Sequence, residues 1–367
     1  MSTPLADKIK SMIRQSGPIS VRDYFALCLG DPDHGYYRKK EPFGVDGDFV
    51  TAPEISQLFG EMIGIFLIHA WQRHGKPENV RLCEIGPGRG TMMSDILRVI
   101  EKLAPDLFAN LHVHLVETSD RLQKVQSQTL VEYKFKIDWH ADFNTVPDGF
   151  LLAVANELFD AIPIRQIIKM GSDFHERMVD LDELGNLTFA LGPPVPDEDR
   201  PSLIGHYSDG TILEPAPDRA AFMQTICDRL IAGGGTFITI DYGSLASGVG
   251  DTLQAIKNHS FDPPLANPGE ADLTSHVDFE ALAAVARNAG LQVHGIQHQG
   301  DFLLGLGLLQ RAGALGQGSS ALTQDAIRIA VQRIAGEGAG NMGELFKVLA
   351  VSSPAIALTP FEVTDTH

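Results

Sequence analysis

Cysteine is scarce in this chain. Its 367 residues include only Cys28, Cys83 and Cys227, which lie far apart in the sequence. No C-x-x-C pair is present, and no histidine follows a cysteine at the spacing of a zinc site. The sequence therefore predicts neither a disulfide framework nor a metal site, and we expect three buried free thiols.

Long apolar runs are also missing. No stretch of about 18 or more uncharged apolar residues occurs, which argues against a membrane-spanning helix. Residues 1–15 have the charges and apolar spacing of an amphipathic helix rather than of a signal peptide. We expect a protein that is not inserted in a membrane and that resides in the cytoplasm.

Basic residues are outnumbered, with 29 Lys and Arg against 47 Asp and Glu, a formal net charge of -18. Such a surface repels phosphate backbones, so nucleic acid is not expected as a partner. It attracts basic partners instead. Solubility alone is an equally good explanation of the acidity.

A glycine-rich turn follows the apolar residues 80–85. Its cofactor-binding candidates are Gly86, Pro87, Gly88 and Gly90, and glycine at alternate positions lets a backbone approach a ligand closely. The third glycine of the dinucleotide pattern G-x-G-x-x-G is missing, because Thr91 takes its place. Glu84 precedes the turn, and a carboxylate there suits an ammonium or sulfonium group better than a pyrophosphate. The turn therefore favours S-adenosyl-L-methionine, which carries both cations.

Strands and helices alternate from residue 80 onward. This rhythm predicts an α/β fold, a doubly wound and mostly parallel seven-stranded Rossmann-like sheet. We expect five regions: an N-terminal helical and lid region at 1–75, the first half of the cofactor domain at 76–163, an inserted substrate-side subdomain at 164–214, the second half with a helical insertion at 215–352, and a tail at 353–367.

Polar side chains follow the predicted strands, at the edge where open sheets bind ligands. Glu117 ends the second strand, and its two oxygens suit the vicinal hydroxyls of a ribose. Asp142 and Phe143 follow the third strand and are candidates for the adenine amino group and ring. A turn cap explains Asp142 equally well.

The fourth strand, residues 151–155, leads directly into Asn156, Glu157 and, after Leu158 and Phe159, Asp160. Carboxylates after a buried run need partners, so they favour a functional role over a structural network. We predict Glu157, Asp160 and Asn156 as catalytic residues and Phe159 as a substrate contact. The prolines that amide-methylating enzymes carry here are absent, which indicates a planar cationic acceptor such as a guanidinium.

A polar, glycine-bearing segment at residues 47–60 precedes a long apolar helix that we expect to run to about His74. It is predicted to fold over the cofactor as a lid, with Thr51 and Gln57 as cofactor contacts and Glu54 as a substrate contact. Helix capping alone also explains Thr51 and Glu54. Asp241 and Tyr242, after a later strand, are further candidates for lining the substrate pocket.

Taken together, these motifs resemble those of the MidA-like family, over about residues 7–352. The segments that carry the resemblance are 47–60, 84–91, 113–117, 156–163, 271–274, 277–279 and 342–347. The resemblance implies a class I S-adenosylmethionine-dependent methyltransferase fold with an added helical region. For the mitochondrial members it implies symmetric dimethylation of an arginine on a core subunit of respiratory complex I.

The sequence therefore predicts a protein arginine N-methyltransferase that acts on a complex I subunit or a similar protein, in a cytoplasmic member of bacterial type. Two alternatives stay open. One is a non-catalytic assembly protein that keeps the fold and binds a partner, and the other is an NAD-dependent oxidoreductase on a similar sheet.

Overall fold

The computed structural model describes residues 2–39, 51–133, 137–200, 207–257 and 259–361. The chain forms two compact units, each built from three segments. The accessory unit comprises Met1–Phe49, Phe159–Ala221 and Ser247–Val277, and the sheet unit comprises Val50–Leu158, Phe222–Ala246 and Asp278–His367. These boundaries differ from the five expected regions. The expected N-terminal region is divided, with its first 49 residues in the accessory unit and residues 51–75 in the sheet unit, and the expected insertion belongs to the accessory unit.

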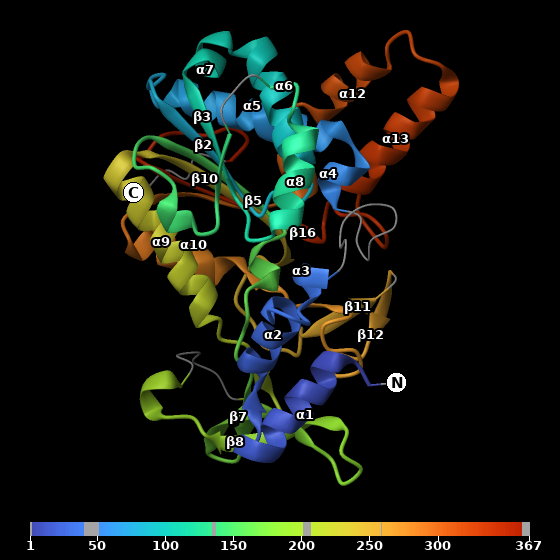
Figure 1. The fold of residues 1–367 in the computed structure, drawn as a ribbon. Coiled ribbons are helices and arrows are strands. Elements are labelled where there is room, and N and C mark those ends of the chain that lie inside the picture. The colour runs from blue at the N-terminus through green and yellow to red at the C-terminus, as the bar shows by residue number, and fades with distance from the viewer. Residues whose placement is uncertain (1, 40–50, 134–136, 201–206, 258, 362–367) are drawn as a thin grey trace. The chain divides into compact units, whose positions relative to one another are not determined.

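The sheet unit contains the predicted doubly wound sheet (Figure 1). Seven strands follow the order β15-β16-β10-β5-β2-β3-β4, and the short β14 (Val277–Asp278) pairs with β10. The pairs from β10 to β4 are parallel, whereas β16 is antiparallel to both of its neighbours. The strand bounds are β2 Val80–Ile85, β3 Leu111–Val116, β4 Ile137–His140, β5 Leu151–Asn156, β10 Gly235–Ser244, β15 Gln292–His298 and β16 Phe346–Ser353.

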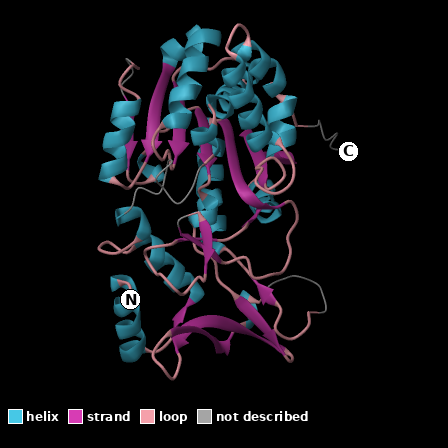
Figure 2. Cartoon of the chain, turned by 90° about the vertical axis from the view of Figure 1, so that its right-hand side faces the viewer, coloured by secondary structure: helices cyan, strands magenta, loops and turns pink. Residues whose placement is uncertain are grey.

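Helices lie on both sides of these strands (Figure 2). Both faces of the central strands are covered, so nearly all of their residues are buried, polar ones such as Glu84 and Thr239 included. Leu82, Leu152 and Ile238 have no exposed surface and belong to one core with Phe66. The helix bounds are α4 Ala52–Ile55, α5 Gln57–Arg73, α6 Thr91–Leu103, α7 Pro105–Asn110, α8 Asp120–Thr129, α9 Pro217–Gly233, α10 Phe279–Asn288, α11 Gln299–Gly305, α12 Leu308–Gly316 and α13 Ala321–Ala335.

The helix expected from Thr51 to His74 is interrupted. Ser56 is extended (φ -160°, ψ 136°), which ends α4 and starts α5, and its Oγ accepts a hydrogen bond from the backbone N–H of Leu58. Thr51 stands at the start of α4 but makes no capping bond with its side chain. The expected cap by Thr51 is therefore wrong, because Ser56 caps the long helix. Residues 47–50 of the expected lid lie outside the described residues.

The accessory unit has its own small core. Leu5 and Ile9 of α1 (Pro4–Ser16) and Tyr24 and Phe25 of α2 (Val21–Gly30) are buried in it. Its first sheet is antiparallel in the order β1-β7-β6-β9 with β8 beside β7, and its second has the order β12-β11-β13. The other bounds are α3 Tyr36–Lys39, β1 Ile19–Ser20, β6 Ile167–Met170, β7 Asp173–Leu181, β8 Leu187–Pro194, β9 Ile212–Leu213, β11 Gln254–Lys257, β12 Ser260–Asp262 and β13 Asp272–Thr274.

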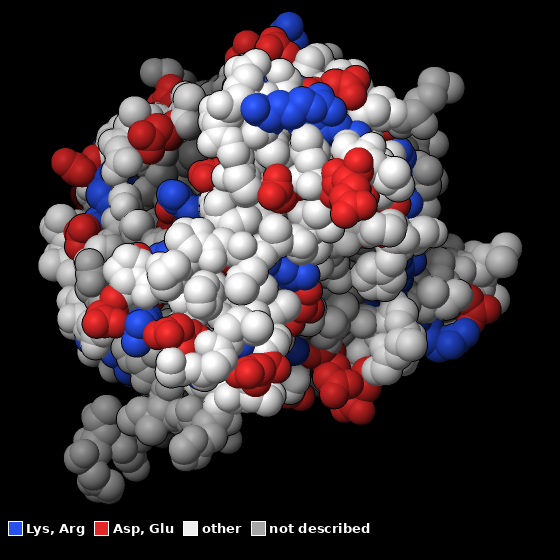
Figure 3. Space-filling view, turned by 90° about the horizontal axis from the view of Figure 1, so that it is seen from below, with Lys and Arg blue, Asp and Glu red and all other residues white. Residues whose placement is uncertain are grey.

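All three cysteines are buried free thiols. Within the described ranges, no helix has the length and apolar character needed to cross a membrane, and no three metal-ligating side chains gather into a cluster. On the face drawn in Figure 3, acidic and basic side chains lie next to one another. The excess of acid therefore does not form one patch of single sign on that face.

Candidate active site

Parallel pairing brings the carboxyl ends of β10, β5, β2, β3 and β4 to one edge of the sheet. Glu84, Glu117 and Asn156 stand at this edge, at or directly beyond the ends of their strands, and Asp241 follows Ile240, the residue of β10 that pairs with Asn156. Open α/β sheets bind their ligands there. We call this edge the candidate cofactor edge.

The glycine turn has the backbone that only glycine adopts without strain. Gly86, Gly88 and Gly90 have φ of 72°, 52° and 81°. A β-carbon at Gly86 would stand 3.2 Å from Cδ1 of Leu158, so the turn is also crowded from the neighbouring strand end. Gly90 precedes α6 without any side-chain cap, so the first N–H groups of that helix are left to other acceptors.

Glu84 is the most distinctive group at this edge. Only 2% of it is exposed, and burial raises the pKa of its carboxyl to about 8. The backbone N–H of Met93 donates to this carboxyl, but its Oε2 has no hydrogen-bond partner within the described part of the chain. A buried carboxylate oxygen without a partner is costly, and a cation would offset that cost. The residues present therefore fit the cationic cofactor expected from the sequence.

Glu117 is held by groups from α8. Its Oε1 accepts the backbone N–H of Ser119 at 2.7 Å, and its Oε2 accepts Nε2 of Gln126 at 3.2 Å. The backbone N–H of Thr118 also donates to this carboxylate, which leaves one of its four lone-pair positions for a hydroxyl group. Gln126 also donates to the carbonyl oxygen of Gly88 at 2.8 Å and accepts from Nε1 of Trp139. Gln126 was not predicted from the sequence, because a glutamine on the mostly polar helix α8 gives no sign that its side chain is fully buried.

Asp142 and Phe143 occupy structural positions. Asp142 is exposed and caps a short 3-10 helix by accepting the backbone N–H of Asn144 at 2.9 Å. The ring of Phe143 is buried against Phe222, with the guanidinium of Arg229 over it. The structure thus gives Asp142 the capping role that was left open, and a contact of either residue with adenine stays a prediction.

Asn156, Glu157 and Leu158 form a strained turn at the end of β5. Glu157 has φ of 52°, which is rare for a residue with a side chain and is concentrated at functional positions. Asn156 donates from Nδ2 to Oε1 of Glu157 at 3.0 Å. The backbone N–H groups of Leu158 and Tyr242 both donate to the fully buried carboxylate of Asp241. Asp241 therefore holds the turn that presents Glu157.

Tyr242 is also part of the scaffold of this edge. It is 8% exposed, and its ring meets that of Phe346 edge-on at 5.9 Å. The predicted contacts of Asp241 and Tyr242 with a substrate remain predictions.

Phe159 and Asp160 belong to the accessory unit, in the 3-10 helix η2 (Phe159–Ala161), where both are buried. Arg219, which the sequence analysis did not single out, is 3% exposed and donates to the carbonyl oxygens of Asp160 and Ile162. It also donates to Oγ of Ser275 at 2.6 Å. Arg219 thereby joins η2 to the segment after β13.

Glu54 and Gln57 make contacts within the sheet unit. Glu54 accepts the hydroxyl of Thr91 at 2.6 Å, which ties α4 to the first residue of α6. Gln57 donates to Glu61, a buried carboxylate that also binds Arg98. This ion pair could not be predicted from the sequence. Thr51, which precedes α4, is buried and makes no capping hydrogen bond with its side chain.

Comparison with known proteins agrees with this geometry. A family model for S-adenosyl-L-methionine-dependent methyltransferases matches residues 62–297. The chain is 34% identical to the mitochondrial protein arginine methyltransferase NDUFAF7 of Xenopus tropicalis, over 92% of this chain and 83% of that protein. It is 33% identical to the human protein of the same name, over 83% and 74%.

A solved structure of similar fold is a methyltransferase-like protein from Burkholderia thailandensis bound to S-adenosyl-homocysteine. Its TM-score is 0.84 at 29% identity, and the match covers 96% of this chain and 93% of that one. The predicted class of fold is therefore confirmed.

The expected cytoplasmic location is wrong, because these curated relatives are mitochondrial proteins. The compartment of a protein depends on targeting signals, and the residues of the candidate cofactor edge carry no information about them. The match to the family model and the identity to the relatives both extend over most of the chain. This chain belongs to the MidA-like family of S-adenosyl-L-methionine-dependent methyltransferases.

Proposed function

We propose that this enzyme is a protein arginine N-methyltransferase whose acceptor is an arginine on a subunit of respiratory complex I or on a similar protein. The curated relatives are named protein arginine methyltransferases, which supports arginine as the acceptor residue. The observation that carries the proposal is Glu157, a carboxylate in a left-handed conformation, held by Asn156 and by the Asp241 turn at the end of β5.

The cofactor would be held by residues of the sheet unit. Glu84 would receive its ammonium group, Glu117 a ribose hydroxyl, and Gly86 to Gly90 would let the backbone lie close to it. When bound, S-adenosylmethionine supplies a methyl group made electrophilic by the positive charge on sulfur. Gln126 fixes both Glu117 and the carbonyl of Gly88, so it positions two of these contacts at once.

Glu157 would hold the acceptor guanidinium. Two parallel N–H···O bonds to a carboxylate orient the planar group and select it over an ammonium. A guanidinium is protonated in water, so one proton must leave during or after transfer. Glu157 would receive that proton.

Labelling with a radioactive methyl donor tests the acceptor. The purified chain would be incubated with S-adenosylmethionine labelled on its methyl group and with a mitochondrial extract, followed by mass spectrometry of the labelled polypeptide. We expect label on arginine, in a subunit of complex I. Label on lysine or on a glutamine amide would contradict the proposal, and the absence of any label would favour a non-catalytic assembly protein.

A further inference from the structure

One buried amide connects the glycine turn, the end of β3 and strand β4. Gln126 of α8 has no exposed surface. Its Nε2 donates to the carbonyl oxygen of Gly88 at 2.8 Å and to Oε2 of Glu117 at 3.2 Å. Its Oε1 accepts a hydrogen bond from the indole Nε1 of Trp139 at 2.8 Å. The third contact brings in a residue of β4 that has no place in the proposed binding of the cofactor.

The chemistry of these partners allows the amide only one orientation. The indole N–H of Trp139 can donate but not accept, and the carbonyl oxygen of Gly88 can accept but not donate. Oε1 of Gln126 must therefore face Trp139, and both N–H groups of Nε2 must face acceptors. A flipped amide would place Oε1 against two other oxygens and leave the indole N–H without an acceptor, which is costly in a buried site. Gln126 is thus held as a double donor.

Trp139 and the glycine turn leave this amide little room to move. Trp139 pairs with Leu115 of β3 in the parallel register, and its ring packs against the core of the sheet unit. At the glycine turn, a β-carbon at Gly90 would stand only 3.4 Å from Cγ of Gln126. The amide therefore has a fixed position as well as a fixed orientation.

Glu117 depends on Gln126 for the orientation of its carboxylate. Two other donors to this carboxylate are the backbone N–H groups of Thr118 and Ser119, which directly follow Glu117 in the chain. Gln126 donates from nine residues further along, within α8. Because three of the four lone-pair positions are occupied, one is left to accept a ribose hydroxyl. The direction of that position follows from where the three donors hold the carboxylate.

We propose that Gln126 is a positioning residue that makes cofactor binding depend on a ribose hydroxyl. It acts through Glu117, because it fixes the direction of the acceptor position that is left on this carboxylate. Trp139 supports it by holding the amide as a double donor. The proposal rests on the placement of the cofactor in the proposed function, and it does not depend on which residue of the acceptor protein is methylated.

Titration calorimetry of the full chain with two ligands tests this role. One ligand is S-adenosylhomocysteine, and the other is its 2′,3′-dideoxy analogue, which lacks both ribose hydroxyls. We call the ratio of their dissociation constants the hydroxyl preference. The unmodified enzyme is expected to prefer S-adenosylhomocysteine by about 10- to 100-fold, the range of a hydrogen bond to a charged group. A change in the glycine turn weakens both ligands alike and cancels in the ratio.

Gln126→Met keeps the length of the side chain and removes both donors, so the hydroxyl preference is expected to fall at least about fivefold. Trp139→Phe is the milder change, because it keeps an apolar ring on β4 and removes the indole N–H. Oε1 of Gln126 then loses its partner, and the preference is expected to fall at least about twofold. If thermal unfolding shows that Gln126→Met is not folded at the temperature of the titration, an unchanged preference in Trp139→Phe overturns the proposal.

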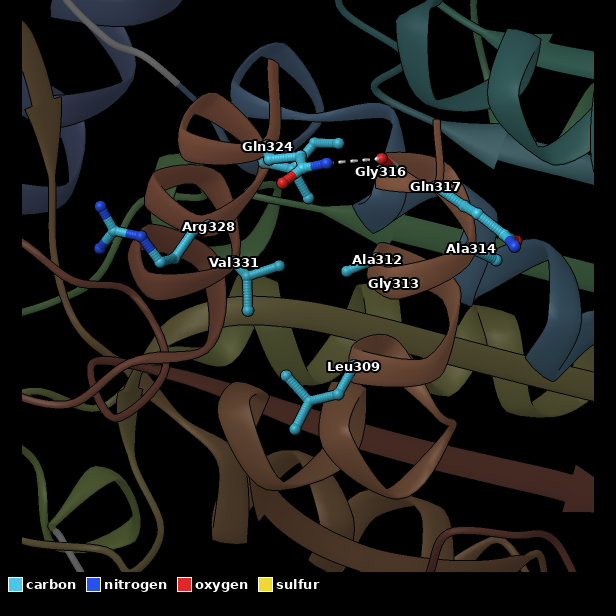
Figure 4. Close-up of a pocket in the computed structure, with 10 residues that line it drawn as sticks. Leu309, Ala312, Gly313, Ala314, Gly316, Gln317, Gln324, Arg328 and Val331 are labelled. Atoms are coloured by element: carbon cyan, nitrogen blue, oxygen red, sulfur yellow. Dashed lines mark hydrogen bonds between the residues drawn. The ribbon is translucent and has the colours of Figure 1, made fainter. Parts of the chain in front are cut away.

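Two other glutamines are controls for the substitution itself. Gln299→Met removes an equally buried amide, whose Nε2 donates to the carbonyl oxygen of Ile334 at 2.7 Å. Gln324→Met removes an amide that also donates to a glycine carbonyl, that of Gly316, at 3.3 Å in the groove between α12 and α13 (Figure 4). Both variants should keep the full hydroxyl preference, even if Gln299→Met lowers the thermal unfolding temperature.

Glu117→Gln separates this proposal from the placement of the cofactor. A preference that is lost in Glu117→Gln but kept in a folded Gln126→Met enzyme would overturn the positioning role alone. A preference that is kept in Glu117→Gln, or that is absent from the unmodified enzyme, would contradict the placement of the ribose at Glu117 and the proposal with it. Loss of the preference in Gln299→Met would also overturn the proposal, since the effect would then follow from the loss of any buried amide.

Discussion

Glu157→Gln is expected to lower the rate of methyl transfer by a factor of about 10² to 10⁴ while leaving cofactor affinity unchanged. Glutamine has the same shape, and its amide oxygen can still accept the hydrogen bond from Asn156. The charge that pairs with a guanidinium and receives its proton is lost. Initial rates with labelled cofactor and calorimetry with S-adenosylhomocysteine measure the two effects separately.

Glu280→Gln is the control for this substitution. Glu280 of α10 pairs with Arg287 at 2.8 Å and is not among the residues predicted to contact the cofactor or the acceptor. We expect its transfer rate to equal that of the unmodified enzyme. A Glu157→Gln enzyme that retained full turnover would remove Glu157 from the reaction.

Gly86→Val is expected to reduce cofactor affinity at least about 100-fold. Valine is strongly disfavoured at φ of 72°, and its side chain would start 3.2 Å from Leu158 and extend over the turn. Titration calorimetry with S-adenosylhomocysteine measures this loss directly.

Gly75→Val separates backbone strain from crowding of the cofactor. Gly75 has a similar φ of 82°, but no atom lies within 4 Å of its β-carbon position. The control should lose some stability and keep its affinity for S-adenosylhomocysteine. If Gly86→Val bound the ligand as tightly as this control, the glycine turn would not be the cofactor site.

The sheet and its glycine turn could be predicted because their signals are local. The central strands are short, mostly apolar runs, and the turn at Gly86 needs glycine at fixed positions, so neighbouring residues suffice for both predictions. The acids at the strand ends could be predicted in the same way, from the residues next to them. Their roles could not, because a carboxylate at a strand end can bind a ligand or hold a turn. Asp241 holds a turn, and only its hydrogen bonds from the backbone of Leu158 and Tyr242 show this.

Contacts between distant residues could not be predicted. Arg311 binds Glu61 across 250 positions of the chain, and Arg219 joins Asp160 to Ser275. No periodicity encodes such pairs, because they depend on how helices pack. The break at Ser56 was missed for a related reason: the apolar pattern continues through it, and only the extended backbone ends α4 there.

The central claim is that Glu84 holds the positive charge of the cofactor. At pH 7 its raised pKa, about 8, leaves this carboxyl mostly protonated in the free enzyme. An ammonium group beside it would lower that pKa, so binding must release a proton, and affinity must increase as the pH rises toward 8.

Calorimetry of S-adenosylhomocysteine binding at pH 7, in two buffers of different ionisation enthalpy, measures this proton release. The account predicts that the unmodified enzyme releases close to one proton more than Glu84→Gln, which should also bind more weakly. Equal proton release and equal affinity in the two proteins would contradict it.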